Sequence, residues 1–219
     1  MHFLSSLKDL FIDFLFPKTR KVLELEALST GTLLEILPPA QDLKDGNVIA
    51  LFDYAHPLVK ELIWELKYSG NPHIAEKLGE IAFDHLRQEL EDRHFFGKWG
   101  RPIIIPIPMS GKRQSERGWN QSELLAEEIV KRDSEKIFKY MPRQLIKVRH
   151  TESQTKTASR NERLQNLTDS MKIANDQSVK GRSVILLDDV TTTGATFAEA
   201  RRALGAAGAP KILCLALAH

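Results

Sequence analysis

The sequence predicts an α/β protein whose central, mostly parallel sheet is flanked by helices. Strand-like and helix-like segments alternate from residue 57 to residue 219, which is the pattern of βαβ units with right-handed crossovers. The strand-like segments are continuous apolar runs, such as residues 184–187 and 212–217, rather than alternating ones. Such runs are typical of parallel strands that are buried on both faces by helices.

The N-terminal part is expected to be an appendage to this sheet. Residues 3–15 place apolar side chains at helical spacing until Phe16-Pro17, which predicts an amphipathic helix. Its apolar stripe would pack on the body of the protein or on a partner, such as a second copy in a homodimer. Residues 18–55 are expected to form a small, partly extended, hood-like segment with short strands at 33–37 and 48–54.

From residue 57 the expected elements follow one another closely. Pro57 suits a first helical position, and the turn residues from Tyr68 to Pro72 end the helix that it starts. We therefore divide the chain into residues 1–56, the appendage, and residues 57–219, the sheet domain. Helices are expected at 57–67, 73–91, 120–132, 158–167 and 197–207, and strands at 102–107, 144–148, 170–174, 182–188 and 211–217.

The composition is that of an ordinary globular protein, 42% hydrophobic and 27% charged, with a net charge of +2. The net charge is −3 over residues 1–56 and +5 over the rest, so the basic surplus lies with the motifs and suits an anionic ligand. Cys214 is the one cysteine, which excludes a disulfide within the chain and favours a reducing, cytoplasmic location. No apolar run approaches the roughly 18 residues that span a bilayer.

The most informative stretch is Val184-Ile-Leu-Leu-Asp188-Asp189-Val-Thr191-Thr192-Thr193-Gly194-Ala195-Thr196. An apolar strand runs into two adjacent carboxylates and then into a Thr/Gly loop that opens a helix. Open α/β sheets bind ligands at the carboxyl ends of their strands, and helix N-termini bind phosphate. Carboxylates accept hydrogen bonds from vicinal hydroxyls, so the stretch favours a phosphorylated sugar. The alternative is an ordinary strand-to-helix turn with Thr and Gly as caps.

Two further loops carry clustered cations. Residues 109–121 contain Lys112, Arg113 and Arg117 just before a predicted helix, and such donors suit a diphosphate. Residues 147–166 are polar and basic, and would add cations and exclude water if they closed over a substrate. The candidate cations of this second loop are Arg149, Arg160 and Arg163. Taken alone, each loop is better interpreted as a solvated basic turn.

In order, the three stretches resemble the pyrophosphate loop, the flexible loop and the PRPP loop of type I phosphoribosyltransferases, which bind phosphoribosyl pyrophosphate (PRPP). More narrowly, the chain resembles the ComF family of competence-associated proteins over about residues 58–219. The patterns that carry this resemblance are P-I-P-x(8)-R-G-W-N-Q, R-x-T-x-x-Q-T-x-x-S-R-x-E-R-x-x-N, L-L-D-D-V-T-T-T-G-A-T and Leu66-Lys67-Tyr68-Ser69-Gly70.

The resemblance implies a type I phosphoribosyltransferase-like fold and a PRPP site. Asp188 and Asp189 would hold the ribose 2′- and 3′-hydroxyls, and the loop would bind the 5′-phosphate. The implied loop residues are Thr191, Thr192, Thr193, Gly194, Ala195 and Thr196, and the implied diphosphate cations are Lys67, Lys112, Arg113, Arg117, Arg149, Arg160 and Arg163. Mg²⁺ would be held mostly by oxygens of the substrate itself, as is usual for this ion.

The chain departs from the family's pattern at three places. Family members commonly carry four zinc-binding cysteines after a F-L-F-P-like segment, whereas Lys18-Thr-Arg20 follows Phe14-Leu-Phe-Pro17 here. We therefore expect no zinc and no metal site held by the protein alone. Trp119 stands where relatives have Phe, and Thr192 stands where some phosphoribosyltransferases have an acid that handles a base's proton, which weakens the case for nucleobase chemistry.

Two functions are compatible with these residues. In the first, the protein transfers ribosyl 5-phosphate from PRPP to an unknown acceptor, releases pyrophosphate, and by its resemblance is linked to competence and DNA uptake. In the second, it binds PRPP or a nucleotide as a sensor, or handles single-stranded DNA as an accessory of the competence machinery, without turnover. Trp119 beside the basic loops would allow a base to stack in the second case.

Overall fold

The centre of the molecule is a five-stranded sheet in which every neighbouring pair of strands is parallel. It is seen in a computed structural model that describes residues 20–96, 99–148 and 169–219. The strand order is β1-β7-β6-β2-β3. The strands are β1 (Val48–Phe52), β2 (Ile103–Pro106), β3 (Lys139–Tyr140), β6 (Ser183–Val190) and β7 (Lys211–Ala218). The predicted α/β class with a parallel sheet is confirmed.

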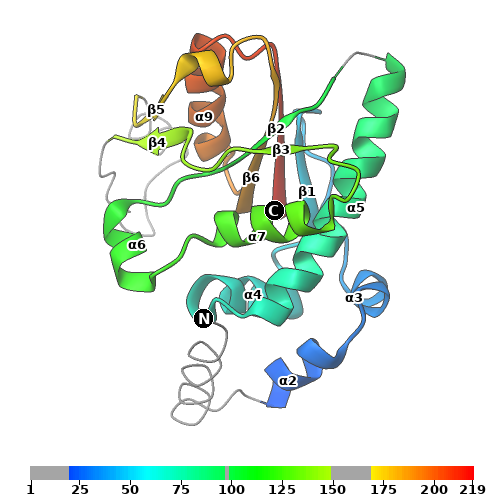
Figure 1. Ribbon diagram of the computed structural model, residues 1–219. Helices are drawn as coiled ribbons and strands as arrows, with labels where there is room; N and C mark the ends of the chain where they lie inside the picture. The colour runs from blue at the N-terminus through cyan, green and yellow to red at the C-terminus, as the bar shows by residue number, and fades with distance from the viewer. Residues whose placement is uncertain (1–19, 97–98, 149–168) are drawn as a thin grey trace.

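Helices cover one face of the sheet, and a helix with a small hairpin covers the other (Figure 1). Alternate residues of β6 enter the two cores, with Ile185 and Leu187 in one and Val184 and Leu186 in the other. The first core includes side chains of α2 (Arg20–Ala27), α3 (Thr30–Ile36), α4 (Pro57–Trp64), α5 (Pro72–Phe96) and α7 (Gln121–Arg132). The second includes α9 (Ala195–Ala206) and the antiparallel hairpin of β4 (Leu145–Lys147) and β5 (Met171–Ile173).

The expected strand at residues 33–37 is wrong, because these residues belong to α3 and its C-cap. Leu33 and Leu37 are buried one helical turn apart, while Leu34 and Ile36 are exposed. The Ser29 side chain caps the helix by accepting a hydrogen bond from the Thr32 amide. α2 likewise replaces extended chain in the predicted hood.

β1 was expected as a strand and is one, and it pairs with β7 at the edge of the main sheet. The sheet therefore begins on the N-terminal side of residue 57, where the predicted boundary between the two parts lies. That boundary stays a prediction. The expected helix at residues 158–167 and the apolar stripe at residues 3–15 lie outside the described residues.

Four further short elements were not expected. They are α6 (Gly111–Arg117), which ends at Gly118 in the left-handed region, the strand β3, the 3₁₀ turn η2 (Asp176–Ser178) before β6, and η1 (Glu65–Ser69). η1 is a turn of π-helix that continues α4, and single π turns are frequent at functional sites.

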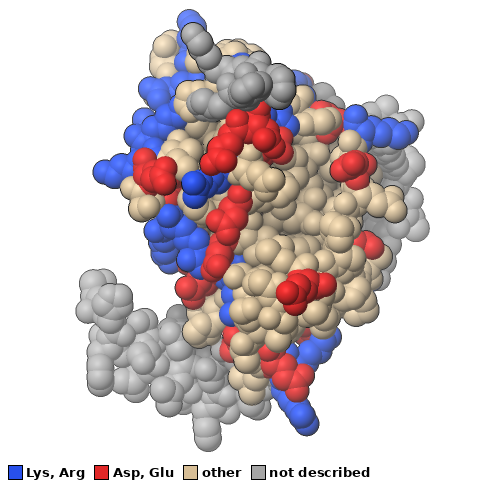
Figure 2. All heavy atoms as spheres, turned by 90° about the vertical axis from the view of Figure 1, so that its right-hand side faces the viewer, with Lys and Arg blue, Asp and Glu red and all other residues tan. Residues whose placement is uncertain are grey.

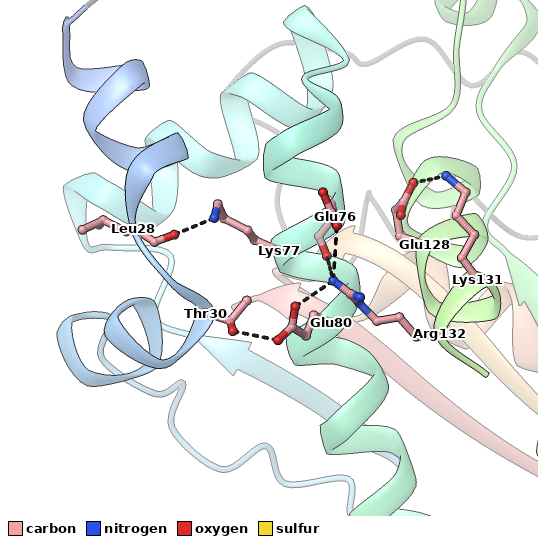
Figure 3. Close-up of polar contacts among 8 residues, drawn as sticks. All are labelled: Leu28, Thr30, Glu76, Lys77, Glu80, Glu128, Lys131 and Arg132. Carbon is pink, nitrogen blue, oxygen red and sulfur yellow. Dashed lines mark hydrogen bonds and ion pairs between the residues drawn. The ribbon is translucent and has the colours of Figure 1, made fainter. Parts of the chain in front are cut away.

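Polar contacts tie α3, α5 and α7 together on the helical side of the sheet (Figure 3). The Arg132 guanidinium lies 2.7 Å from a Glu80 carboxylate oxygen, and Glu80 also accepts a hydrogen bond from the Thr30 hydroxyl at 2.8 Å. Gly79 of α5 lies so close to α7 that an added Cβ would clash with the Glu128 Cβ. The N-terminal helices and the sheet thus share one packed body through α5.

The outer surface of this helical side carries interspersed acidic and basic side chains (Figure 2). Within the part of the chain that the structure describes, no helix combines the length and apolar character needed to cross a bilayer.

Candidate functional site

Two adjacent carboxylates, Asp188 and Asp189, lie at the carboxyl end of β6 and are 9% and 4% exposed. Both contact the first turn of α7, which begins beside this edge of the sheet (Figure 1). The Ser122 hydroxyl donates to Asp188 Oδ1 at 3.1 Å, and the Gln121 side-chain amide donates to Asp189 Oδ1 at 3.2 Å. The positive end of a helix favours negative charge, so α7 supports the pair electrostatically as well.

Asn120 fixes the start of α7 relative to the sheet. Its side-chain oxygen caps the helix by accepting from the Ser122 amide, and its side-chain nitrogen donates to the Ile107 carbonyl at 3.0 Å. Ile107 follows β2, the neighbour of β6. The buried Asn120 therefore couples the end of one strand to the donors that hold the carboxylates of the next.

Lys67 neutralises part of this carboxylate pair. Its ammonium lies 2.6 Å from Asp189 Oδ2, and the two side chains are 22% and 6% exposed. Lys67 comes from η1, so the π turn aims a cation at the end of β6. Burial, and then the neighbouring charge of Asp189, raise the pKa of Asp188 well above its usual value.

Trp119 is a packing residue in this structure. It is half-buried, its indole nitrogen donates to the Leu66 carbonyl at 3.2 Å, and its ring lies against Gly70. A Cβ at position 70 would be 2.8 Å from the ring, and Gly70 has a φ of +57°. The indole thus holds η1 against the loop before α7. Gly70 lies against the ring of the half-buried Trp119, and the suggested stacking of a base on this ring stays a prediction.

The predicted cations are distributed around the pair. Arg117 lies over the Tyr68 ring at 4.5 Å and contacts the Gln121 side-chain oxygen at 3.5 Å. Arg113 is exposed on α6. Lys112 also lies in α6, but its side chain is outside the description, and Arg149, Arg160 and Arg163 lie outside the described residues.

One cation was missed by the sequence reasoning. Lys147 on β4 is half-buried, and its pKa is lowered by burial and by the charge of Arg113, while Asp188 acts in the opposite direction. Its ammonium therefore lies within electrostatic reach of both the basic loop and the carboxylates. Gln121 and Ser122 were missed as well, although their position at a predicted helix start was a usable signal.

The threonine loop joins β6 to α9. Thr191 is buried, its amide donates to the Ala218 carbonyl at 2.9 Å, and its own carbonyl lies 3.0 Å from His219 Nδ1. Gly194 is the N-cap of α9 with a φ of +75° and has no side chain to cap the helix, and the Thr193 hydroxyl accepts from the Ala195 amide at 3.4 Å. Thr192 is exposed, whereas Thr193 and Thr196 are half-buried and Ala195 is buried. Thr191 thus anchors the loop to β7 and the C-terminus, and the amides at the start of α9 lie just beyond it, where helix N-termini in general suit a phosphate.

The carboxylates offer few ligands for a metal ion. Over residues 20–96, 99–148 and 169–219, no three His, Cys, Asp or Glu side chains gather as a metal site would require. Asp188 accepts a hydrogen bond from Ser122 and Asp189 from Gln121, and Lys67 forms an ion pair with Asp189. Two such oxygen ligands fit a Mg²⁺ ion that is held mainly by a substrate.

A cavity of about 720 Å³ lies elsewhere, at the amino end of β7 near Lys211. This is the edge of the parallel sheet opposite to Asp188 and Asp189. Arg201 and Arg202, which line it, form ion pairs with Asp45 and Glu199. Because the two arginines at this cavity are already paired with acids, we place the candidate site at Asp188 and Asp189 rather than in the cavity.

Comparison with known proteins gives several relatives, although no protein-family model matches the chain. The chain is 31% identical to the DNA utilization protein YhgH of Escherichia coli K12 over 195 residues, 86% of this chain and 77% of that protein. It is 29% identical to the competence protein ComFC of Bacillus subtilis, over 67% of this chain and 53% of that protein. It is 34% identical to competence protein F of Haemophilus influenzae, over 53% and 49%.

Two solved structures are similar to the fold at a TM-score of 0.41. They are the allosteric regulatory enzyme of purine biosynthesis and the glutamine PRPP amidotransferase of B. subtilis complexed with ADP and GMP, at 18% and 17% identity. In each case the likeness covers 71% of this chain and 30% of the other.

Proposed function

This chain belongs to the ComF family of competence-associated proteins, and on that premise we propose that it binds PRPP and transfers its ribosyl 5-phosphate to an acceptor. The observation that carries the proposal is the arrangement at the end of β6. Two buried carboxylates stand directly before a loop that leads into α9, whose N-cap is Gly194, with the Lys67 ammonium beside them. A sugar with vicinal hydroxyls and a phosphate matches these two halves.

In the proposed complex the carboxylates orient the ribose. Asp188 and Asp189 accept hydrogen bonds from its hydroxyls, and the amides of residues 193–196 bind its 5′-phosphate. Lys67, whose ammonium lies 2.6 Å from Asp189, would turn from the carboxylate toward an incoming diphosphate.

In the proposed reaction the bond between ribose C1 and the diphosphate oxygen breaks, and pyrophosphate leaves with the electron pair. A new bond forms between C1 and the acceptor nucleophile, whose proton passes to solvent. Positive charge develops at C1 beside the carboxylates, and negative charge develops on the leaving group. The described cations that can stabilise the leaving group are Lys67, Arg113, Arg117 and Lys147. Mg²⁺ bound to the substrate would shield the diphosphate oxygens.

The names of the relatives suggest where this activity would be used. YhgH is named for DNA utilization, and ComFC and competence protein F for competence. We propose that this protein likewise acts in the uptake or use of DNA.

Calorimetry with PRPP and Mg²⁺ tests the binding step. We expect saturable binding to the wild type and its loss in the double variant Asp188→Asn/Asp189→Asn. Asp84→Asn, which alters an exposed carboxylate on α5, is the matched control and should bind like the wild type. No binding by the wild type would refute the proposal.

A pyrophosphate-release assay tests the transfer step. Wild-type protein is incubated with PRPP, Mg²⁺ and a panel of bases and amines, and release above the rate without acceptor identifies a substrate. Binding without release across the whole panel would favour the alternative function, a PRPP sensor. The two assays therefore distinguish the binding of PRPP from the transfer of its ribosyl phosphate.

A further inference from the structure

A cavity with a cationic wall lies at the amino edge of the sheet, opposite the edge that carries Asp188 and Asp189. Its volume is about 720 Å³, which is in the range of sites for small molecules. Among the described residues that line it, none is acidic, and the cations are Arg93, Arg201, Arg202 and Lys211. The wall of this cavity therefore suits an anionic ligand.

Acids that do not line the cavity orient its arginines. The Glu199 oxygens accept from Arg202 Nε at 2.8 Å and from Arg202 Nη2 at 3.0 Å, and Glu199 is buried. Arg201 pairs with Asp45, whose side chain is 46% exposed. A guanidinium carries five N–H donors, and the contacts described for Arg201 and Arg202 engage only some of them. The acids thus hold the arginines in place and leave donors for a ligand.

The wall beside the cations is apolar. Ala209, Pro210 and Ile212 line the cavity on either side of Lys211. Arg93 lies over the Trp99 ring, with its guanidinium carbon 5.8 Å from the ring centroid. Because Trp99 is only 7% exposed, its ring supports Arg93 rather than presenting a face to a ligand. A ligand that fills this cavity therefore needs an apolar part as well as an anionic one.

α9 connects the cavity to the candidate site at the other edge of the sheet. The helix begins at Ala195, after the threonine loop, and its residues Ala198, Arg201 and Arg202 line the cavity. A ligand in the cavity would therefore contact the same helix as a phosphate at its N-terminus, without competing for Asp188 or Asp189.

We propose that this cavity binds a nucleotide, with its phosphate groups on Arg201, Arg202 and Lys211 and its base against Pro210 and Ile212. Guanidinium groups match the geometry of phosphate oxygens, and the apolar wall matches a planar ring. An inorganic anion would leave that wall in water, and an uncharged ring would make no use of the cations. The inference goes beyond the proposed function, because it concerns a second site and does not require that PRPP binds at the first.

Calorimetry with ADP in the absence of Mg²⁺ tests the proposal. We expect saturable binding to the wild type and to Asp188→Asn/Asp189→Asn, which lacks the carboxylates of the other site. Arg201→Gln and Lys211→Gln should each weaken ADP binding about tenfold, or about 1.4 kcal/mol, because each removes a charge-assisted hydrogen bond. Arg20→Gln on α2, where the side chain is 93% exposed, is the matched control and should bind like the wild type.

A further variant separates the cation from its ion pair. Asp45→Asn removes the acid but keeps Arg201, so it should bind ADP at least as tightly as the wild type, and weaker binding would contradict the role given to Arg201. Adenosine, which has no phosphate, and inorganic pyrophosphate, which has no ring, should each bind more weakly than ADP.

Three results would overturn the inference. They are no saturable binding of ADP, an unchanged affinity in Arg201→Gln/Lys211→Gln, and equal binding of adenosine or of pyrophosphate. Loss of ADP binding in Asp188→Asn/Asp189→Asn would place the nucleotide at the other site and would overturn it as well. PRPP calorimetry on Arg201→Gln/Lys211→Gln keeps the two proposals apart, since the proposed function predicts that this variant binds PRPP like the wild type.

Discussion

Replacing Lys67 by Met should destabilise the folded protein measurably, because it leaves a buried carboxylate without its cation. At 2.6 Å and an effective dielectric constant of about 20, the attraction between Lys67 and Asp189 is about 6 kcal/mol. Removing both groups from water offsets most of this. Since the side chains are 22% and 6% exposed, we expect a loss between the values for surface and buried pairs, about 2–3 kcal/mol.

A double-mutant cycle in urea measures the coupling. Lys67→Met, Asp189→Asn and the double variant are unfolded in parallel, and the free energies of unfolding are compared with the wild type. We expect a coupling energy of about 2 kcal/mol, and a fall in Tm of roughly 4–12 °C for Lys67→Met. The Arg20–Glu24 pair on α2 is 93% and 63% exposed, and the same cycle there should give no measurable coupling.

The outcome decides whether Lys67 is a structural part of the site. A coupling no larger than that of the Arg20–Glu24 pair would refute the reasoning, because it would mean that water screens the Lys67–Asp189 contact. A full-sized coupling together with weakened PRPP binding in Lys67→Met would show that one ammonium serves both the fold and the ligand.

Three further predictions concern burial and close packing. Asp188→Asn should raise the urea midpoint at neutral pH while abolishing PRPP binding. Since the folded pKa of Asp188 lies above the ordinary 3.8, the free energy of unfolding of the wild type falls as pH rises from 3.8 through the folded pKa. The same rise in pH should lower the free energy of unfolding of the Asn variant less. Gly79→Ala should cost about 1–3 kcal/mol in urea unfolding because its Cβ would meet Glu128, whereas Gly205→Ala, with open space around it on α9, should gain up to about 1 kcal/mol. Cys214 is buried with a pKa raised to about 12 by burial, so a thiol reagent should label it only in urea; rapid labelling of the native protein would contradict its place in the sheet.

The sheet could be predicted because its central strands are buried on both faces and therefore read as unbroken apolar runs. The same signal failed at residues 33–37, where Leu-Leu-Glu-Ile-Leu suits a strand or a helix equally well. Only packing on the core decides that Leu33 and Leu37 face inward together. α6 gave no signal, because its seven residues Gly-Lys-Arg-Gln-Ser-Glu-Arg contain no apolar side chain to set a period.

Some residues of the candidate site could likewise be predicted from the sequence and others could not. Asp188 and Asp189 follow from local sequence, since a strand end and a loop are neighbours along the chain. Their partners Gln121 and Lys67 stand 68 and 122 positions before Asp189, and only the folded chain brings them together. The resemblance pointed to Lys67, and no pattern pointed to Lys147, whose side-chain direction depends on the hairpin pairing of β4 with β5.

Because of the π turn at Glu65–Ser69, the site depends on the number of residues in this segment as well as on their identity. Each residue of a helix turns the next by about 100°, so deleting one residue between Trp64 and Gly70 would swing the side chains before it relative to those after it. Lys67 could then face Asp189 or Tyr68 could lie under Arg117, but not both. Homologous chains that keep the two contacts should therefore show no insertions or deletions in this segment, even where its residues differ.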